Sequence, residues 1–540
     1  MNTPHQWVFL FQVWLVTLLI HQVTARNFKS VFLSSGDFYG EEFSLIQVRA
    51  SWDKANVSTP KSLQLTNASI VPLTIKAKTV KESAVEERRP VEKKSKGNVY
   101  YAQELMNFGD VQYAGNITVG GQELLAVLDT GSFENLVFSA DCMGCGDTTV
   151  LYRHEDHSSY QMDEWKSTHA FGSGSAESQL ASDDFQIGPL EAKDQYFWEV
   201  TSANMPVIEQ GNFQAIIGVG PSGSAQLELE AEALTANATV KSFQEAKMTV
   251  PSYTLKAAVS SNKFAEAMAT KEPLLDHLNC TIFSYCLQRK KGSPGWFYWN
   301  DNDPVHKPEL FQEVPVQGEV TWGVKMAKAR LEYIMPPVIN GTEVNVTMDP
   351  IRLGCDPSCG AIVDTGTSLF AVPPDVYERA HKALKDIGND CKKISQLPEL
   401  KFQLGDHEYT LPPHSYAGQV AGLLKPQLKR FFPWISNDIN QCHLLLMQVN
   451  TKTQFGPMWI IGMPFFREYY TTFHLSSPTR NTSDTNHTRS IFTARAGENC
   501  TAAPPALRSE LMEEVRMMDL ARLSIPHWVQ ELQEDGYHHA

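Results

Sequence analysis

A four-residue pattern of Asp, Thr, Gly and a hydroxyl residue occurs twice in the chain, 235 positions apart. The first copy is Asp129–Ser132 and the second is Asp364–Thr367, and each follows a run of apolar, mostly branched side chains. Such runs predict buried strands, and the Gly allows the backbone to turn sharply after each acid. The repeat therefore predicts two similar halves, each with one carboxylate at the end of a buried strand.

Two carboxylates in such apolar surroundings can share one proton. A buried carboxylate is difficult to ionise, and two of them held about 3 Å apart cannot both be charged. One member then acts as base and the other as acid, which is what the activation of water against a peptide carbonyl requires. Asp129 and Asp364 are therefore the candidate catalytic residues, and the chemistry needs no metal and no other cofactor. We interpret His154 and His157 as loop residues, not metal ligands.

Several stretches between about Tyr113 and Ala496 resemble the pepsin-like aspartic proteases, the pepsin and cathepsin D type. The resemblance implies an all-β fold with short helices and two lobes related by a pseudo-two-fold axis, with a cleft between them. It also implies an aspartic endopeptidase acting on extended polypeptides, most active at acidic pH. The most specific stretches are Ile362–Leu369, Trp459–Gly462 and Phe466–Phe473, and weaker ones are Tyr113–Gly120, Ala215–Gly220 and Gly172–Gly174.

The resemblance also assigns roles around the two acids. The hydroxyls of Ser132 and Thr367 would bond the outer carboxylate oxygens, and Thr130 and Thr365 would cross-link the lobes beneath the acids. Gly131 and Gly366 complete the set that supports the dyad.

A β-hairpin over residues 168–178 is the expected flap above the cleft, and here the sequence departs from the family. Phe171 stands where a tyrosine is usual, and Val137 stands where a tryptophan commonly supports that tyrosine, after an apparent extra residue. We expect Phe171 to cover the bound peptide and Val137 to fill the tryptophan's space. The backbone N–H groups of Gly172 and Ser173 would contact a substrate strand.

The segments before the two lobes are interpreted as processing segments. Residues 1–25 have the apolar stretch and small-residue cleavage site of a signal peptide, with an uncleaved anchor as the alternative. Residues 26–99 carry 13 Lys and Arg against 8 Asp and Glu, which leaves −20 on the rest of the chain. This asymmetry favours a basic pro-segment and linker that inhibits an acidic enzyme, although a loop that is never cut remains possible.

The remaining expected boundaries are an N-terminal lobe over 100–278, a C-terminal lobe over 279–496 and a tail over 497–540. Residues 222–249 read as helix in an insertion. Apolar residues at three and four spacing over 509–523 predict an amphipathic helix that docks on the catalytic body.

Cysteines and glycosylation sequons indicate the secretory pathway. The resemblance implies disulfides Cys142–Cys145, Cys355–Cys359 and Cys391–Cys442. Cys280 and Cys286 would lie about 20 Å apart along one strand, so Cys500 could pair with one of them and leave one thiol free. A tenth sequon, at Asn116, lies in a strand-like run; the nine candidate glycosylation sites are Asn56, Asn67, Asn237, Asn279, Asn340, Asn345, Asn481, Asn486 and Asn499.

These features predict a secreted protein or one in an acidic, lysosome- or vacuole-like compartment. We expect a monomer with polypeptide substrates, its own pro-segment as an intramolecular inhibitor, no nucleic-acid partner and no membrane span after signal cleavage. Two other classes remain open: a catalytically silent binding or inhibitor protein on the same fold, and an adhesive glycoprotein.

Overall fold

The computed structural model describes residues 99–525 except 148, 172–173, 210, 334–337, 340–341, 344–348, 385–390, 434, 436–440, 476–488 and 505–514. The predicted signal peptide and all but the last residue of the predicted pro-segment lie outside the described residues. So do Gly172 and Ser173 of the flap and six sequons: Asn56, Asn67, Asn340, Asn345, Asn481 and Asn486.

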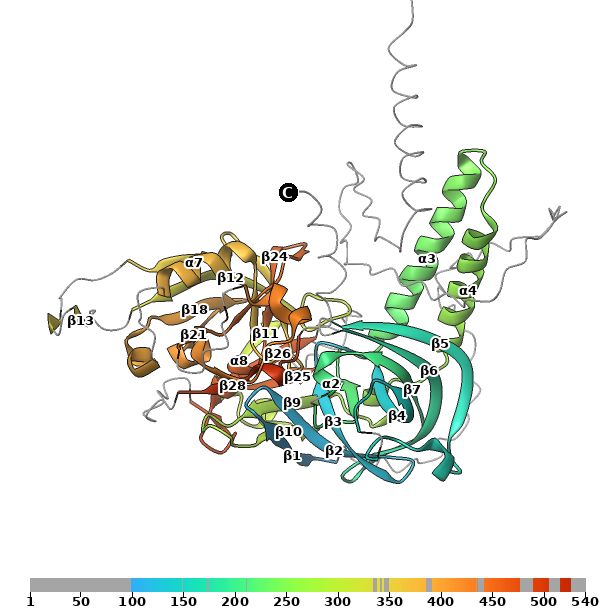
Figure 1. Ribbon diagram of the computed structural model, residues 1–540, viewed down its shortest axis with the longest axis horizontal. Helices are drawn as coiled ribbons and strands as arrows, with labels where there is room; N and C mark the ends of the chain where they lie inside the picture. The colour runs from blue at the N-terminus through green and yellow to red at the C-terminus, as the bar shows by residue number, and fades with distance from the viewer. Residues whose placement is uncertain are drawn as a thin grey trace, which may run out of the picture.

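Strands dominate the described residues and gather in two lobes (Figure 1). The larger sheet has 14 strands, in the order β11-β26-β25-β9-β10-β1-β2-β3-β8-β4-β7-β6-β5, with β27 beside β26. Because β1 pairs with β10 and β25 pairs with β9, this sheet joins the N-terminal lobe to strands from the end of the chain. Its members are β1 (Tyr101–Phe108), β2 (Gln112–Val119), β3 (Gln122–Asp129), β4 (Asn135–Met143), β5 (Gln161–Phe171), β6 (Gly174–Ile187), β7 (Leu190–Asn204), β8 (Ala215–Gly218), β9 (Ile282–Leu287), β10 (Gly295–Trp299), β11 (Gln312–Pro315), β25 (Tyr469–His474), β26 (Ser490–Ala496) and β27 (Ala502–Ala503).

The C-terminal lobe is built on a nine-stranded sheet in the order β19-β18-β12-β16-β24-β17-β22, with β15 and β23 beside it. Two smaller sheets, β13-β14 and β21-β20-β28, complete the strands. The members of all three are β12 (Gly323–Glu332), β13 (Val338–Ile339), β14 (Thr342–Glu343), β15 (Ile351–Gly354), β16 (Cys359–Val363), β17 (Phe370–Val372), β18 (Glu399–Leu404), β19 (His407–Leu411), β20 (Ala417–Ala421), β21 (His443–Leu444), β22 (Leu446–Gln448), β23 (Lys452–Thr453), β24 (Gly456–Ile461) and β28 (Met517–Asp519). The prediction of a mainly β, bilobal fold is confirmed.

The same strand arrangement occurs once in each lobe. In the N-terminal lobe β3 runs parallel to β8, and β4 returns antiparallel to β8. In the C-terminal lobe β16 runs parallel to β24, and β17 returns antiparallel to β24. The sequence repeat therefore has a structural counterpart, with one copy of the tetrapeptide where each first strand leads into its connection.

Buried aromatic side chains hold the two lobes together. Phe283 on β9 stacks between Phe297 and Phe473, with ring centroids 5.0 and 5.1 Å apart. Trp322 packs edge-on against Phe283, and its indole N–H donates to the carbonyl of Val219 at 3.0 Å. The buried indole nitrogen thus has a partner from the other lobe, which favours one relative orientation of the lobes.

Helices are short apart from a pair that projects from the N-terminal lobe (Figure 1). The helix predicted within 222–249 is confirmed as α3, whereas its partner α4 was not predicted. Tertiary contacts hold this helix pair on the lobe, because Trp165 and Trp198 of the lobe pack on Phe264 of α4. The α-helices of the described residues are α2 (Pro206–Glu209), α3 (Ser224–Glu245), α4 (Ser252–Met268), α5 (Leu274–His277), α6 (Asp303–His306), α7 (Pro374–Leu384) and α8 (Met463–Glu468).

Four disulfides are present among the described residues. They include the three expected pairs, Cys142–Cys145, Cys355–Cys359 and Cys391–Cys442. The fourth joins Cys286 to Cys500, and Cys280 is a buried free thiol. The sequence had left the partner of Cys500 open.

The predicted amphipathic helix over 509–523 is wrong in its described part. Met517–Asp519 form strand β28, parallel to β20, and Leu520–Arg522 form a single 3-10 turn. Pairing with β20 satisfies backbone groups that a helix would have satisfied internally, and it places Met518 and Leu520 in the core. Tertiary contacts have therefore overridden a helical periodicity.

Candidate active site

The two acids of the repeated tetrapeptide meet at the boundary between the lobes. Asp129 is the last residue of β3, and Asp364 directly follows β16. A Cβ placed on Gly131 would lie 2.6 Å from Cγ of Asp364, and one on Gly366 would collide with the carboxylate of Asp129. Each carboxyl group therefore rests on the glycine of the opposite tetrapeptide, and only glycine leaves room for it.

Each carboxyl group is held by the same two bonds from its own lobe. The N–H of Gly131 donates to Oδ1 of Asp129 at 2.8 Å, and the hydroxyl of Ser132 donates to Oδ2 at 2.6 Å. In the other lobe the N–H of Gly366 and the hydroxyl of Thr367 donate to Asp364 at 2.7 and 2.6 Å. These bonds fix the plane of both carboxyl groups.

Two threonines join the lobes beneath the acids. The hydroxyl of Thr130 donates to the carbonyl of Val363 at 2.9 Å and accepts the N–H of Thr365 at 2.9 Å. The hydroxyl of Thr365 reciprocates, donating to Leu128 at 2.7 Å and accepting from the N–H of Thr130 at 2.9 Å. All four bonds are buried, so they set the distance between the strands that carry the acids.

Burial and mutual repulsion perturb the ionisation of both acids. Asp129 is 8% exposed and Asp364 only 1% exposed. Burial raises the pKa of Asp129 above its usual value. Burial, followed by the negative charge of Asp129, raises the pKa of Asp364 well above its usual range. The two acids thus act on each other's ionisation, an arrangement that favours one shared proton.

Comparison with known proteins agrees with this geometry. Residues 112–481 match the family described as eukaryotic aspartyl protease, which is more than half of the chain. The chain belongs to this family. It is accordingly an aspartic endopeptidase.

Relatives within the family are distant but cover most of the chain. Probable vacuolar protease A of Trichophyton verrucosum is 25% identical over 413 residues, 73% of this chain and 82% of the relative. Pepsin A of Gallus gallus is 23% identical over 386 residues, 69% and 83% of the two chains. Renin of Rattus norvegicus is 25% identical over 403 residues, which are 71% of this chain and 82% of the relative.

The pocket of this aspartyl protease that contains the dyad is otherwise mainly apolar. Phe171, at the end of β5, lines it from the β5–β6 hairpin, where we predicted the flap. Val137 does not pack beside Phe171. It faces the core on the opposite side of β4, whereas its neighbours Leu136 and Phe138 belong to the same apolar cluster as Phe171. The expectation that Val137 fills space beside Phe171 is therefore wrong, because side chains alternate along a strand and Val137 faces the side opposite to that of its two neighbours. The pocket is lined by Val127, Asp129, Phe171, Met205, Val207, Phe213, Ile216, Asp364, Gly366, Ser524 and Ile525.

A polar link that we did not predict connects the flap strand to the loop after Asp129. His169 is fully buried, with Nδ1 2.7 Å from Oε2 of Glu134 and Nε2 2.7 Å from Oγ of Ser178. Glu134 itself belongs to the loop that carries Ser132, and its carbonyl accepts the N–H of Gly218 at 3.0 Å. The signal in the sequence was a His two residues before Phe171, on the same face of the strand, together with a carboxylate in the lengthened loop.

Two further residues in the pocket, Ser524 and Ile525, come from the C-terminal segment. We predicted that this segment would dock on the catalytic body, but nothing in its sequence showed that it would reach the acids.

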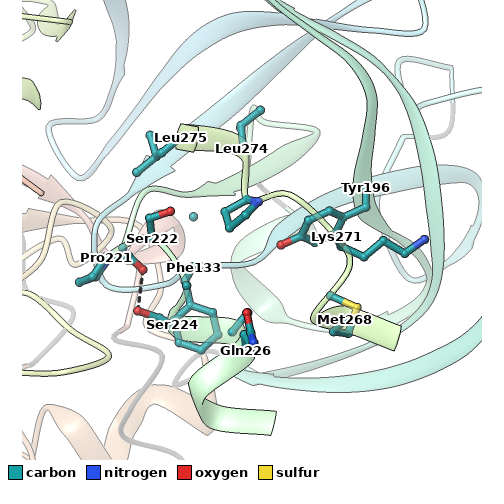
Figure 2. A pocket seen from close by; sticks show the side chains of 15 residues that line it. Phe133, Tyr196, Pro221, Ser222, Ser224, Gln226, Met268, Lys271, Leu274 and Leu275 are labelled. Atoms are coloured by element: carbon teal, nitrogen blue, oxygen red, sulfur yellow. Dashed lines mark hydrogen bonds between the residues drawn. The ribbon is translucent and has the colours of Figure 1, made fainter. Parts of the chain in front are cut away.

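Figure 2 shows a second pocket, in the N-terminal lobe between the start of α3 and the end of α4. Phe133, Met268 and Lys271 are among the 15 residues that line it, and the hydroxyl of Ser224 donates to Pro221 within it at 2.6 Å. These lining residues, all within the described part, include no Asp, Glu, His or Cys. The pocket therefore offers no acid–base pair comparable to the dyad.

Within the described residues, no group of three or more His, Cys, Asp or Glu side chains is arranged to hold a metal ion. No helix of that part of the chain is both long and apolar enough to cross a membrane.

Proposed function

We propose that Asp129 and Asp364 form a proton-sharing dyad that activates water for the hydrolysis of peptide bonds in extended polypeptides at acidic pH. The observation that carries the proposal is the mirrored arrangement of two buried carboxyl groups, each held by an N–H and a hydroxyl from its own tetrapeptide.

In this mechanism Asp129 starts as the carboxylate and Asp364 as the acid. The negative charge of Asp129 is one cause of the raised pKa of Asp364, which supports this assignment of the proton. A water molecule between them gives a proton to Asp129 as its oxygen attacks the substrate carbonyl carbon, while Asp364 protonates the carbonyl oxygen. The tetrahedral intermediate then collapses: the C–N bond breaks, Asp129 passes its proton to the leaving nitrogen, and Asp364 recovers its own.

The supporting residues have separate roles in this proposal. Ser132 and Thr367 keep the carboxyl groups oriented towards the water, and Thr130 and Thr365 keep the two acids at a constant separation. Phe171 covers the reacting bond and excludes bulk water, which strengthens the electrostatic interactions beneath it. The N–H groups of Gly172 and Ser173 are proposed to hold the substrate backbone, although both residues lie outside the described part of the chain.

A secretory or vacuole-like acidic compartment is the proposed location, and a monomer is the proposed state. Relatives include proteins named vacuolar protease A and pepsin A. The described sequons Asn237, Asn279 and Asn499 are all exposed, as is Asn116, so each is accessible to glycosylation.

Hydrolysis of a denatured protein at acidic pH, blocked by a pepstatin-type statine inhibitor, tests the proposal. Asp129→Asn and Asp364→Asn should each reduce hydrolysis to below about 1% of wild type, and the double variant should be no worse, because the pair acts as a unit. Circular dichroism and melting of the same variants would show that they are folded. Substantial hydrolysis by either folded single variant would exclude the dyad. Inhibitor binding without any hydrolysis by the wild type would instead favour the silent binding protein.

A further inference from the structure

The C-terminal segment Val515–Ile525 runs along the C-terminal lobe and ends beside the dyad. Its first part is anchored by charge and by backbone pairing. Arg516 is buried, with Nη1 3.5 Å from Oδ1 of Asp110, and its Nη2 donates to the carbonyl of Arg289. Strand β28 follows and pairs in register with β20, with Met517 opposite Gln419. The start of the segment is therefore part of the folded body.

The next residues turn the chain towards the cleft. Asp519 caps the 3-10 turn by accepting the N–H of Ala521 at 3.1 Å, and it also binds the guanidinium of Arg522 at 2.7 Å. Leu520 and Leu523 are completely buried in a cluster that includes Ile362 on the strand leading to Asp364. These contacts direct residues 523–525 towards the acid of the C-terminal lobe.

The end of the segment is held by backbone bonds, as an extended peptide would be. Ser368, the residue after Thr367, donates its N–H to the carbonyl of Ser524 at 3.2 Å, and its Oγ accepts the N–H of Ser524 at 2.8 Å. The Ser368 hydroxyl donates its own proton to the carbonyl of Val111 at 2.6 Å, which fixes its orientation. Both backbone groups of Ser524 are thus satisfied by one residue next to the catalytic tetrapeptide, the type of bonding by which an added strand is recognised.

Ile525 then lies in the pocket that contains the acids. It is 3% exposed and lines the same pocket as Asp129, Asp364 and Phe171. A polypeptide that reaches the dyad along this side of the cleft must occupy the space of Ser524 and Ile525, so the two cannot be bound together.

We propose that residues Leu523–Ile525 are a built-in, substrate-like occupant of the cleft, which a polypeptide substrate must displace before it binds. This proposal rests on the proposed function of the dyad. It identifies Ser368 as the point where the chain's own C-terminal segment and a substrate backbone compete. The apparent affinity for any cleft ligand is then the intrinsic affinity multiplied by the fraction of molecules in which the segment has left the cleft.

A matched pair of substitutions at one position tests this competition in the full-length chain. Ser524→Pro removes the N–H that Ser368 accepts, whereas Ser524→Ala keeps both backbone bonds. Leu523 has φ −59° and ψ 125°, a conformation that the residue before a proline readily adopts. The measured quantity is the Kd of a pepstatin-type inhibitor at acidic pH, together with the KM for a denatured protein substrate.

We expect Ser524→Pro to lower Kd and KM by about threefold to tenfold, because the competing segment loses roughly one hydrogen bond. Ser524→Ala should leave both Kd and KM unchanged. Hydrogen exchange of residues 520–525 in the wild type should become faster when the inhibitor binds. Ile525→Ala, with Ile525→Val as its control, provides a second test if Ser524→Pro does not fold.

The outcomes separate this proposal from the proposed function. Equal Kd and KM in both members of a folded pair, together with wild-type hydrogen exchange that does not change when the inhibitor binds, would overturn the competition and leave the proposed function of the dyad intact. Tighter inhibitor binding by Ser524→Pro with no hydrolysis by any variant would support the competition and overturn the proposed function. Absence of both binding and hydrolysis throughout would overturn both.

Discussion

The ionisation of Asp364 opposes the folded state. Asp364 is nearly inaccessible to water and faces a second carboxyl group, and these two causes raise its pKa well above the usual value. Its own hydrogen bonds, from Thr367 and Gly366, act in the opposite direction but do not cancel the effect. The site therefore retains a proton at pH values where an exposed aspartate would have lost it.

This pKa predicts how stability changes with pH. The native state keeps the Asp364 proton above about pH 4, where the unfolded chain releases it, so ionisation of this group lowers the free energy of unfolding as pH rises through the folded pKa. Asp364→Asn removes that penalty. We expect the variant to match wild type near pH 3.5 and to become more stable than wild type at higher pH, by about 1.4 kcal/mol for each unit of raised pKa.

Urea unfolding at several pH values measures this difference. Asp406→Asn, a change at an exposed aspartate in the turn between β18 and β19, is the control and should show no comparable trend. A difference between Asp364→Asn and wild type that does not grow with pH would contradict a raised pKa at Asp364.

A second prediction at this scale concerns the buried link between His169 and Glu134. Glu134→Ala and His169→Phe each remove the bond that holds flap strand β5 against the loop carrying Ser132. We expect each to lower kcat/KM by about tenfold, roughly 1.4 kcal/mol of transition-state stabilisation, because the flap would be less well positioned. Glu134→Gln should retain most activity, since its amide oxygen can still accept a hydrogen bond from the ring.

The double variant decides whether the two residues act through one interaction. If they do, Glu134→Ala combined with His169→Phe loses no more activity than either single change. Losses that multiply would show that the residues act independently.

At the scale of elements, the strands that lead to the acids depend on each other through Thr130 and Thr365. Each threonine hydroxyl bridges from one lobe to the backbone of the other, donating to a carbonyl and accepting an N–H there. The separation of the acids is thus set by main-chain groups of β3 and β16, which vary little with side-chain motion.

Thr130→Val should weaken this connection with little change of shape. It leaves the N–H of Thr365 and the carbonyl of Val363 buried without their partner, at about 1 to 3 kcal/mol for each group. We expect the free energy of unfolding to fall by about 2 to 5 kcal/mol in denaturant titrations, and kcat to fall with it. Thr130→Ser retains the hydroxyl and serves as the control. Equal stability of the Val and Ser variants would show that these bonds do not join the lobes.

At the scale of the whole molecule, one sheet unites segments from both ends of the chain. β1 lies beside β10, and β25 and β26 return to the same sheet. The Cys286–Cys500 disulfide fixes the end of this arrangement, across 214 positions of sequence. The two lobes therefore share one platform, and the cleft forms above it.

The charge distribution along the chain predicts acid activation. Residues 26–99 carry about +5 and the rest carries −20, so we expect full-length protein to be inactive at neutral pH and to gain activity when acidification protonates carboxylates. The new amino terminus should lie between about Arg88 and Tyr100, because residues from Tyr101 onward are paired with β10. Amino-terminal sequencing during an acid time course measures this. Immediate full activity of uncut protein at neutral pH would contradict it.

The sequence by itself determined the features that depend on short segments. Asp129 and Asp364, their glycines and their hydroxyl neighbours were identifiable because each tetrapeptide carries its turn, its hydrogen-bond donors and its acid within four residues. Two similar halves followed from the repeat, and the bilobal β fold followed from the resemblance to the pepsin-like proteases. The helix α3 followed from its run of helix-favouring residues. Cys142–Cys145 and Cys355–Cys359 were within reach because their partners are close in sequence.

Only the tertiary structure decided which distant groups meet. Packing placed Val137 in a different cluster from Phe171 and brought Glu134 to His169. The side of a strand that a residue faces changes with every position, so a sequence alignment with a gap nearby does not settle it. The segment after Val515 has a helical periodicity, yet β20 offered unpaired backbone groups and a buried surface, so it became a strand and continued to Ser368. Local patterns specify local conformations, whereas the partners of an edge strand, a cysteine or a buried histidine are set by the packing of the whole chain.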